Sequence, residues 1–346
     1  MEFSLHNNFS GLALLSEDWN ALLAASVTHI PFLRYEYLSA WWATRGGGEW
    51  PESALSTVMA HQDGRLAGIA PLFSARNLDG EPALLLLGSI EISDYLDIIV
   101  QPADLSIFLA GLLDFIARPA CLDWRLLDWH NLPEASPTLP ALQAEAKKRG
   151  WDFTQDRTYH VPSIPLTGDF NTYLTGIDKK QRHEIRRKMR RAGESGRNVR
   201  WYIVEDKSSL DAEVQAFLEL MAEAPEKAAF LTPPMRRQMH LACRAAFKFG
   251  WLQLAFLEAD GQKAAGYLNF DYLNRIWVYN SGINPRFMDL SVGWVLLGHL
   301  LQWANENKRT EFDFMRGNED YKYRFGGVDK FVVRAKVIRN PLLKLA

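Results

Sequence analysis

Acids, phenols and cations gather in one stretch near the C-terminus, TEFDFMRGNEDYKYRFGGV at residues 310–328. Apolar and polar residues alternate over its first six positions, which predicts a half-buried strand that ends at Gly317. We expect Asn318 to cap a short helix after this strand, and Gly326 and Gly327 to end it. Five side chains at the strand end and on the helix are candidates for catalytic chemistry: Asp313, Arg316, Tyr321, Lys322 and Tyr323.

Each of these polar residues also has a structural interpretation. A solvated surface helix carries similar charges, and any of the five side chains could simply fix the turn. For Asp313 and Arg316 an ion pair within the protein is as well supported as a role in a site. Two phenols beside two cations, bracketed by glycines, are unusual for a solvated helix and favour a functional site.

Composition bounds the class of protein. The chain has 346 residues, 48% of them hydrophobic, and a net charge of −2, so it can bury a large core and is not a polyelectrolyte binder as a whole. Two cysteines indicate a reducing compartment. We find no signal peptide, no membrane-length apolar run and no metal-binding spacing, and we expect a soluble, cytoplasmic protein without a metal.

The two halves of the chain follow one order of elements. In the first half we expect a helix over Tyr35–Thr44, a hairpin turning at Asp63-Gly64, and a strand over Trp124–Trp129. DGRLAGIAPLF at Asp63 resembles DGQKAAGYLNF at Asp260, about 198 residues later. This repeat predicts two copies of one mixed α/β domain, over residues 1–160 and 161–346, each with helices on the faces of its sheet.

A strongly basic segment, residues 177–200, separates the halves. It holds ten Lys and Arg residues against three acids, with a narrow apolar stripe through Ile185 and Met189. One interpretation is a solvated first helix of the second domain. The other is an electrostatic surface for a phosphorylated or nucleotide-bearing partner, such as coenzyme A or RNA. The absence of interleaved aromatic residues argues against sequence-specific RNA recognition.

The basic helix, the strand–turn–strand, SGINPRFMDLSVGWVLL and FDFMRGNEDYKYRFG together resemble the CelD-like branch of the GNAT acyltransferase superfamily. That branch is similar to the Fem-type aminoacyl transferases, which carry two GNAT-like domains in one chain. The resemblance covers residues 170–340, and the first half follows through the internal repeat. It implies tandem GNAT-like (acyl-CoA N-acyltransferase) domains, the first of them degenerate because it has no equivalent of YKYRFG.

The resemblance also implies where an acyl donor binds. An acyl-CoA, with acetyl-CoA favoured, would lie between two parallel strands that part, Arg275–Ser281 and Thr310–Met315. The helix Val292–Asn305 would point its N-terminus at the donor's pyrophosphate, where free N–H groups favour an anion. Of the two glycines usual in the family's donor motif, this sequence has only Gly293. The implied donor-binding residues are Asn280, Ser281, Arg286, Ser291, Val292 and Gly293.

GNAT-type transfer proceeds by direct attack of the acceptor on the donor, so no Ser-His-Asp set is required. Following the family's use of a Tyr after the same strand, Tyr321 or Tyr323 would protonate the leaving thiolate. Lys322 would hold an acceptor carboxylate or the developing charge, and Asp313 and Arg316 would orient the acceptor.

The favoured function is therefore a GNAT-type N-acyltransferase that moves an acyl group from coenzyme A to an amine or hydroxyl of a small metabolite, an amino sugar or a polysaccharide precursor. The first alternative is a Fem-like aminoacyl transferase that uses aminoacyl-tRNA, with tRNA as the less favoured partner. The second is a double-GNAT binding module without catalysis. Neither the acceptor nor the oligomeric state follows from the sequence.

Overall fold

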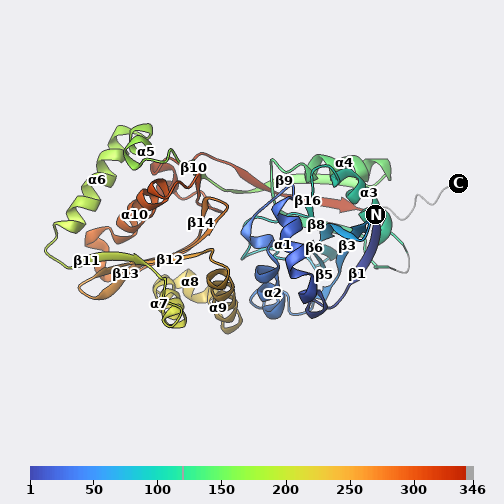
Figure 1. Ribbon diagram of the computed structural model, residues 1–346, viewed down its shortest axis with the longest axis horizontal. Helices are drawn as coiled ribbons and strands as arrows, with labels where there is room; N and C mark the ends of the chain where they lie inside the picture. The colour runs from blue at the N-terminus through green and yellow to red at the C-terminus, as the bar shows by residue number, and fades with distance from the viewer. Residues whose placement is uncertain (119–120, 340–346) are drawn as a thin grey trace. The chain divides into compact units, whose positions relative to one another are not determined.

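The computed structural model describes residues 1–118 and 121–339, which fold as two compact units (Figure 1). Unit 1 comprises Met1–Tyr159 together with the C-terminal segment from Phe331, and unit 2 comprises His160–Lys330. The fold class is the predicted mixed α/β arrangement with mixed sheets.

Unit 2 is built on one six-stranded sheet in the order β10-β15-β14-β13-β12-β11. All neighbours are antiparallel except β14 and β15, which are parallel. The strands are β10 (Ser163–Pro165), β11 (Val199–Ile203), β12 (Leu252–Ala259), β13 (Gln262–Tyr272), β14 (Arg275–Ile283) and β15 (Glu311–Asp313).

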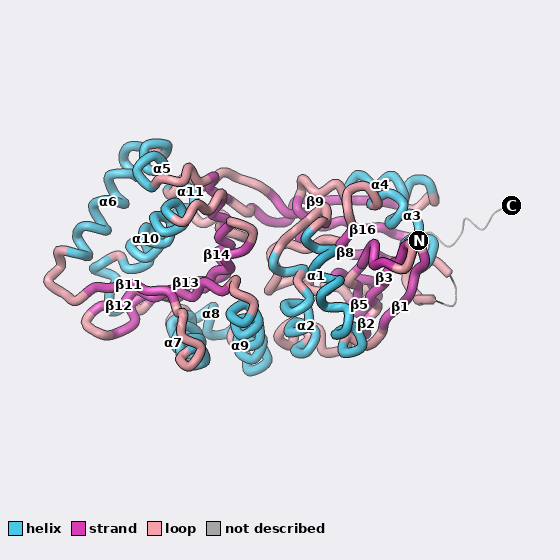
Figure 2. The backbone as a smooth tube through the Cα atoms, viewed as in Figure 1, coloured by secondary structure: helices cyan, strands magenta, loops and turns pink. Residues whose placement is uncertain are grey.

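Helices cover both faces of this sheet, as Figure 2 shows. On one face α10 packs against β12, β13 and β14 and is itself covered by α5 and α6, while α7 and α9 pack on the other face. The helices are α5 (Phe170–Gly176), α6 (Lys179–Gly193), α7 (Leu210–Ala222), α8 (Pro225–Phe230), α9 (Pro233–Lys248), α10 (Val292–Glu306) and α11 (Asp320–Arg324).

Helix α10 is the central helix of unit 2 because it is apolar almost all round. Ten of its residues are buried, which is expected of a helix held between a sheet and a second helix layer. Gly298 lies under the Met189 side chain of α6, and an added Cβ would come within 2.8 Å of that sulfur. The basic helix is thus anchored on α10 by its narrow apolar stripe, and its cations face outward.

Unit 1 has two sheets, ordered β1-β3-β4-β7 and β2-β5-β6-β8-β16-β9. Its strands are β1 (Glu2–His6), β2 (Ala54–Leu55), β3 (Thr57–Gln62), β4 (Arg65–Ala70), β5 (Leu72–Arg76), β6 (Pro82–Leu86), β7 (Ile99–Val100), β8 (Leu126–Pro133), β9 (Asp152–His160) and β16 (Phe331–Ile338). Its helices are α1 (Ser16–Ala24), α2 (Tyr35–Thr44), α3 (Leu105–Ile116) and α4 (Thr138–Lys148).

The internal repeat is visible in the backbone. Asp63 and Gly64 have φ of 51° and 76°, and Asp260 and Gly261 have φ of 52° and 76°. Positive φ at both central residues is the signature of a type I′ hairpin turn, for which Asp-Gly is a preferred pair. In each unit the strand after this hairpin pairs with a parallel strand: β6 with β8, and β14 with β15.

Several local predictions differ from the structure. The last strand, Phe331–Ile338, pairs with β8 in unit 1 instead of completing the second half. Residues 311–315 are all buried, so the strand predicted as half-buried has neither face in solvent. Glu319, not Asn318, precedes α11, and no side chain caps that helix. The sequence patterns also missed β9, β11 and α7, and α4 begins within the predicted 133–140 loop.

Candidate functional site

The parallel strands β14 and β15 part soon after they meet. Only three residue pairs join them, from Arg275↔Glu311 to Trp277↔Asp313. β14 then continues to Ile283, while β15 ends at Asp313. A register shift at the Leu268/Asn269 step of β13 leaves Tyr279 as an extra residue in β14, and such a bulge bends the strand. The result is an opening at the carboxyl ends of two parallel strands, where ligands bind in open α/β sheets.

The main chain of Ser281 faces this opening. Its N–H donates to Oδ1 of Asn280 at 2.9 Å, and its carbonyl accepts a hydrogen bond from Nζ of Lys227. The same Lys227 ammonium donates to Asn280 Oδ1 at 2.9 Å. Lys227 lies on the six-residue helix α8 and is half-buried. Burial lowers the pKa of Lys227, and the charges of Glu226 and Glu319 act in the opposite direction.

Lys322 closes the loop between β15 and α11. Its side chain is 3% exposed, and Nζ donates to the carbonyls of Arg316 at 2.7 Å, Gly317 at 3.2 Å and Met315 at 3.4 Å. Its fourth partner is the Glu319 carboxylate, at 2.9 Å. Three N–H donors therefore meet four oxygens, so this ammonium holds the turn and has no donor to spare for a substrate in this conformation.

Glu319 joins the two lysines. Its carboxylate contacts Lys322 and is close enough to Lys227 to influence that pKa, yet 57% of its side chain is exposed. Gly317, with φ of 114°, makes room for this carboxylate, since an added Cβ would lie 2.4 Å from one of its oxygens.

The two candidate phenols have different surroundings. Tyr321 packs its ring edge-on against Phe314, with centroids 5.9 Å apart, and burial raises its pKa well above the ordinary value. Within the described ranges its hydroxyl makes no hydrogen bond. Tyr323 is exposed to solvent and donates to Asp329 at 2.7 Å, and burial and this bond raise its pKa to about 12. Tyr321 is the phenol held in an apolar setting.

Asp313 and Arg316 contribute through the turn. Asp313 is 3% exposed and accepts a hydrogen bond from the Met315 N–H at 2.7 Å. Met315 itself has a φ of 57°, a strained value that this hydrogen bond helps to hold. The Arg316 carbonyl is the nearest oxygen to Lys322. In this conformation both residues shape the strand end.

The expected donor-binding residues lie at and before the start of α10. Ser291 adopts a left-handed conformation, with φ of 54°, and its side chain does not cap the helix. Val292 is a core residue at 1% exposure, so only its main chain is available to a ligand. An added Cβ at Gly293 would lie 2.7 Å from Ile283 at the end of β14, so this glycine brings α10 close to the opening. Arg286 is exposed, and its N–H donates to Asn284.

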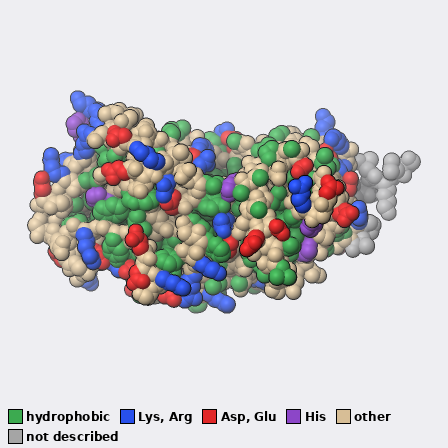
Figure 3. All heavy atoms as spheres, viewed as in Figure 1, with side chains coloured by type: hydrophobic (Ala, Val, Ile, Leu, Met, Phe, Trp, Pro, Cys, Tyr) green, Lys and Arg blue, Asp and Glu red, His purple; other side chains and the backbone are tan. Residues whose placement is uncertain are grey.

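A basic hollow adjoins the segment that leads into α10. It has a volume of about 410 Å³ and is lined by Arg187, Arg190, Arg191, Glu194, Ser195, Arg197, Asp289 and Leu290. Arg197 pairs with Asp289 at 3.1 Å, whereas Arg191 is exposed. Figure 3 shows Lys and Arg side chains gathered where α6 lies in Figure 1. Four guanidinium groups against two carboxylates suit a phosphorylated ligand.

In unit 1 the protein itself fills the corresponding opening. β6 and β8 pair through only two residues, and the segment after β6 then lies against β8. The Asn131 side chain donates to the carbonyls of Ile90 at 2.9 Å and Ser93 at 2.8 Å, and the Asn131 carbonyl accepts from the Leu96 N–H. Buried residues of this chain therefore occupy the place that a donor would take.

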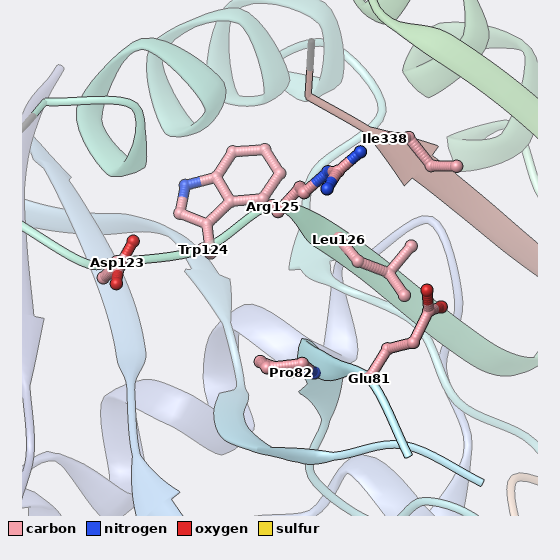
Figure 4. Close-up of a pocket in the computed structure, with 7 residues that line it drawn as sticks. All are labelled: Glu81, Pro82, Asp123, Trp124, Arg125, Leu126 and Ile338. Atoms are coloured by element: carbon pink, nitrogen blue, oxygen red, sulfur yellow. The ribbon is translucent and has the colours of Figure 1, made fainter. Parts of the chain in front are cut away.

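The hollow of unit 1 is in a different place. It has a volume of about 430 Å³ and lies where β6 and β8 begin, the opposite end from an α/β ligand site (Figure 4). Its lining comprises Glu81, Pro82, Asp123, Trp124, Arg125, Leu126 and Ile338.

The described residues hold no group of three His, Cys, Asp or Glu side chains arranged to bind a metal ion. None of the helices in these ranges combines the length and the apolarity that a bilayer crossing requires.

Sequence reasoning missed two residues at the opening, Lys227 and Glu319. Glu319 lies inside the motif but was not singled out from its neighbours. Lys227 lies in PEKAAF, a helix too short to show a periodic pattern, and it is 53 residues from Asn280 in the chain. The one available signal was Pro225, which is favoured at a helix start and so marks α8.

Comparison with known proteins identifies the second unit. Residues 179–323 match the family model described as an acetyltransferase (GNAT) domain. No curated protein sequence matches the chain. Unit 2 is thus a GNAT-family domain, and its parting strands and central helix are the elements that this family implied.

Solved structures resemble the whole chain. FemX superposes with a TM-score of 0.64 at 12% identity, covering 97% of both chains. A conserved protein of unknown function from Bacteroides thetaiotaomicron gives 0.61 at 11% identity, covering 98% of this chain and all of the other. L-PGS from Bacillus licheniformis gives 0.52 at 12% identity, covering 88% and 92%. At such identities the likeness shows the fold, and the predicted tandem GNAT-like fold of the Fem- and CelD-like branch is confirmed.

Proposed function

We propose that this protein is an acyltransferase that moves an acyl group, with acetyl favoured, from coenzyme A to an amine or hydroxyl of a small acceptor. The opening between β14 and β15 carries the proposal, because it exposes main-chain hydrogen-bonding groups of β14 beside a GNAT-type central helix. A thioester carbonyl placed there can accept hydrogen bonds from β14, as electrostatic catalysis of acyl transfer requires.

The donor's phosphates would lie at the start of α10. The first-turn N–H groups of Val292, Gly293 and Trp294 have no partner within the helix, and Ser291 provides no side-chain cap. Arg286 and the arginines of the basic hollow add positive charge beside this helix start. This assigns the outer face of α6 to the phosphorylated end of the donor.

The acid and the base come from the α11 segment. Tyr321 keeps its proton well above neutral pH because burial raises its pKa, so it can donate that proton to a departing thiolate. Glu319 is the exposed carboxylate at the opening and can accept the proton of an attacking amine. Lys322 acts by holding the loop that positions both residues.

Unit 1 serves as scaffold or as a wall of the acceptor site. Its own side chains fill the opening between β6 and β8, which leaves no room for a donor. We propose that one donor binds per chain. The acceptor class, a small metabolite, an amino sugar or a polysaccharide precursor, rests on the family resemblance alone.

The cationic face of α6 favours a second candidate function, transfer from an aminoacyl-tRNA in the manner of Fem-type enzymes. Lys179, Lys180, Arg186, Arg187, Arg190 and Arg191 are exposed on this one helix. A row of cations of this length suits a phosphodiester backbone. The whole-chain likeness to FemX in fold is compatible with this alternative.

Calorimetric titration of the full chain with acetyl-CoA and, separately, with CoA tests the proposal. Micromolar binding of both, at one site per chain, is the expected result. A folded protein that binds neither would remove coenzyme A as the donor and favour the aminoacyl-tRNA alternative, which a tRNA-binding titration would then examine.

A further inference from the structure

The side-chain oxygen of Asn280 lies between two hydrogen-bond donors at the opening. It is 2.9 Å from the Ser281 main-chain nitrogen and 2.9 Å from Nζ of Lys227. Because both neighbours can only donate, the atom between them must be the carbonyl oxygen of the amide and not its nitrogen. Asn280 therefore places a neutral carbonyl oxygen between one main-chain N–H and one ammonium group.

These two donors belong to rigid parts of unit 2. Ser281 is on β14, whose other edge is paired with β13 through Tyr267, and its own main chain faces the unpaired side. Lys227 is tied to that strand by a second hydrogen bond, to the Ser281 carbonyl. Helix α8, which carries Lys227, packs against α7, and α7 packs against β14.

We propose that the Ser281 N–H and the Lys227 ammonium form the oxyanion hole of this enzyme, and that the Asn280 carboxamide occupies the hole until a donor carbonyl displaces it. This inference rests on the proposed acyl-transfer function. Its new elements are Lys227 as a charged donor from α8 and Asn280 as an internal occupant. Both donor distances fall within the range of about 2.7–3.1 Å expected of oxyanion-hole donors.

The reaction steps balance on these groups. The acceptor nitrogen forms a bond to the thioester carbon, and the π electrons of the carbonyl move to its oxygen, which Ser281 and Lys227 hold. The carbonyl then re-forms, the C–S bond breaks, and its electron pair leaves on sulfur, which takes the proton of Tyr321. The proton lost by the amine passes to Glu319, and exchange with solvent returns both residues to their starting states.

The charges around Lys227 fit this role. Glu319 lies on its far side and is itself held by Lys322 at 2.9 Å, so the ammonium is opposed by a carboxylate that another lysine shares. Its other two contacts are neutral oxygens, of Asn280 and Ser281. Lys227 therefore keeps most of its charge available for an oxyanion, which is a stronger acceptor than the amide oxygen it now contacts.

The internal occupant predicts opposite effects for two substitutions. Lys227→Met removes a donor used most strongly in the transition state, so we expect turnover to fall about 10²–10³-fold while CoA, which has no carbonyl at that position, binds as before. Asn280→Ala empties the hole, so we expect a several-fold lower KM for acetyl-CoA without loss of turnover. Lys227→Arg keeps a charged donor and should restore part of the activity.

The test uses the full chain with acetyl-CoA as donor and hydroxylamine as a small amine acceptor, with thiol release as the readout and CoA binding by calorimetry. Lys207→Met, at an exposed lysine of the same unit, is the matched control. Infrared spectra of acetyl-CoA labelled with ¹³C at the carbonyl add a readout that a purely structural role would not move. The carbonyl stretch should shift to lower frequency on binding, and less so in Lys227→Met.

The outcomes separate the two claims. Lost turnover and a lost carbonyl shift in Lys227→Met, with CoA affinity and the control unchanged, would support the oxyanion hole. Turnover of Lys227→Met within twofold of wild type, or an unchanged carbonyl shift, would overturn it while the proposed function stands. A wild-type protein that binds neither acetyl-CoA nor CoA would overturn the proposed function and this inference with it.

Discussion

Lys322 offers a sharp test of how the α11 segment is held together. Substituting Met keeps the apolar stem of the side chain in place and removes only the ammonium. The Met315, Arg316 and Gly317 carbonyls then lose their shared donor, and Glu319 loses its partner. The chain between β15 and α11 would lose the contact that draws three successive carbonyls to one point.

The expected loss of stability follows from these contacts. A hydrogen bond to a charged group contributes about 1.5–3 kcal/mol net, and two of the three carbonyl bonds have good length. Removing the desolvation cost of the ammonium offsets part of that sum, so we expect unit 2 to lose about 2–3 kcal/mol. For a unit of this size that is a fall in Tm of about 4–12 °C.

Urea and thermal unfolding of the full chain, followed by tryptophan fluorescence, measure this change. Lys207→Met is again the control, and it should stay within about 0.5 kcal/mol of wild type. Turnover of Lys322→Met should also fall, because Tyr321 and Glu319 lie on the loosened segment. If Lys322→Met unfolds like the control and yet loses turnover, Lys322 acts directly on the substrate and the clamp described above is wrong.

Four further predictions test separate parts of the account. Tyr321→Phe should lower turnover about 10²-fold or more, the contribution of a general acid, whereas Tyr323→Phe, which loses only its bond to Asp329, should stay within a few-fold of wild type in the same thiol-release assay. Gly282→Ala should destabilise unit 2 by more than about 2 kcal/mol, because the new Cβ would lie 2.6 Å from the α7 backbone, while Gly176→Ala meets nothing within 4 Å and should be neutral by urea unfolding. Burial raises the pKa of Asp128, but Arg334, His130 and Asn77 outweigh it and hold that pKa well below its usual range, so this carboxylate stabilises unit 1 at neutral pH and stops doing so as pH falls below about 3.9; Asp128→Asn should therefore destabilise at pH 7 and show a smaller loss between pH 5 and pH 2. Arg191→Gln should weaken CoA binding about fivefold at low salt, a change of about 1 kcal/mol, and flatten its salt dependence in calorimetry, whereas Arg65→Gln in unit 1 should leave both unchanged.

Local sequence signals predicted the elements that have strong punctuation. Helix α2 begins and ends at the predicted residues, Tyr35 and Thr44, since three glycines follow it. Both Asp-Gly turns are found as hairpins because that pair suits positive φ at both positions. Each of these signals lies within a few residues of the element it defines.

What the sequence left out depends on contacts between distant residues. β9 is an exposed edge strand, so it shows no apolar alternation. The pattern of β16 predicts a strand, but nothing local tells that it pairs with β8, about 200 residues earlier. The site follows the same rule: Asn280 and Ser281 were found through their strand, whereas Lys227 reaches them only through the packing of α8 beside β14.

Hydrogen–deuterium exchange of the full chain, with and without acetyl-CoA, tests the central claim most directly. The account predicts slower exchange in residues 278–283 of β14 and 291–295 at the start of α10, and no change in residues 83–97 of unit 1. Protection confined to unit 1, or protection nowhere although acetyl-CoA binds, would contradict the assignment of the β14–β15 opening as the donor site.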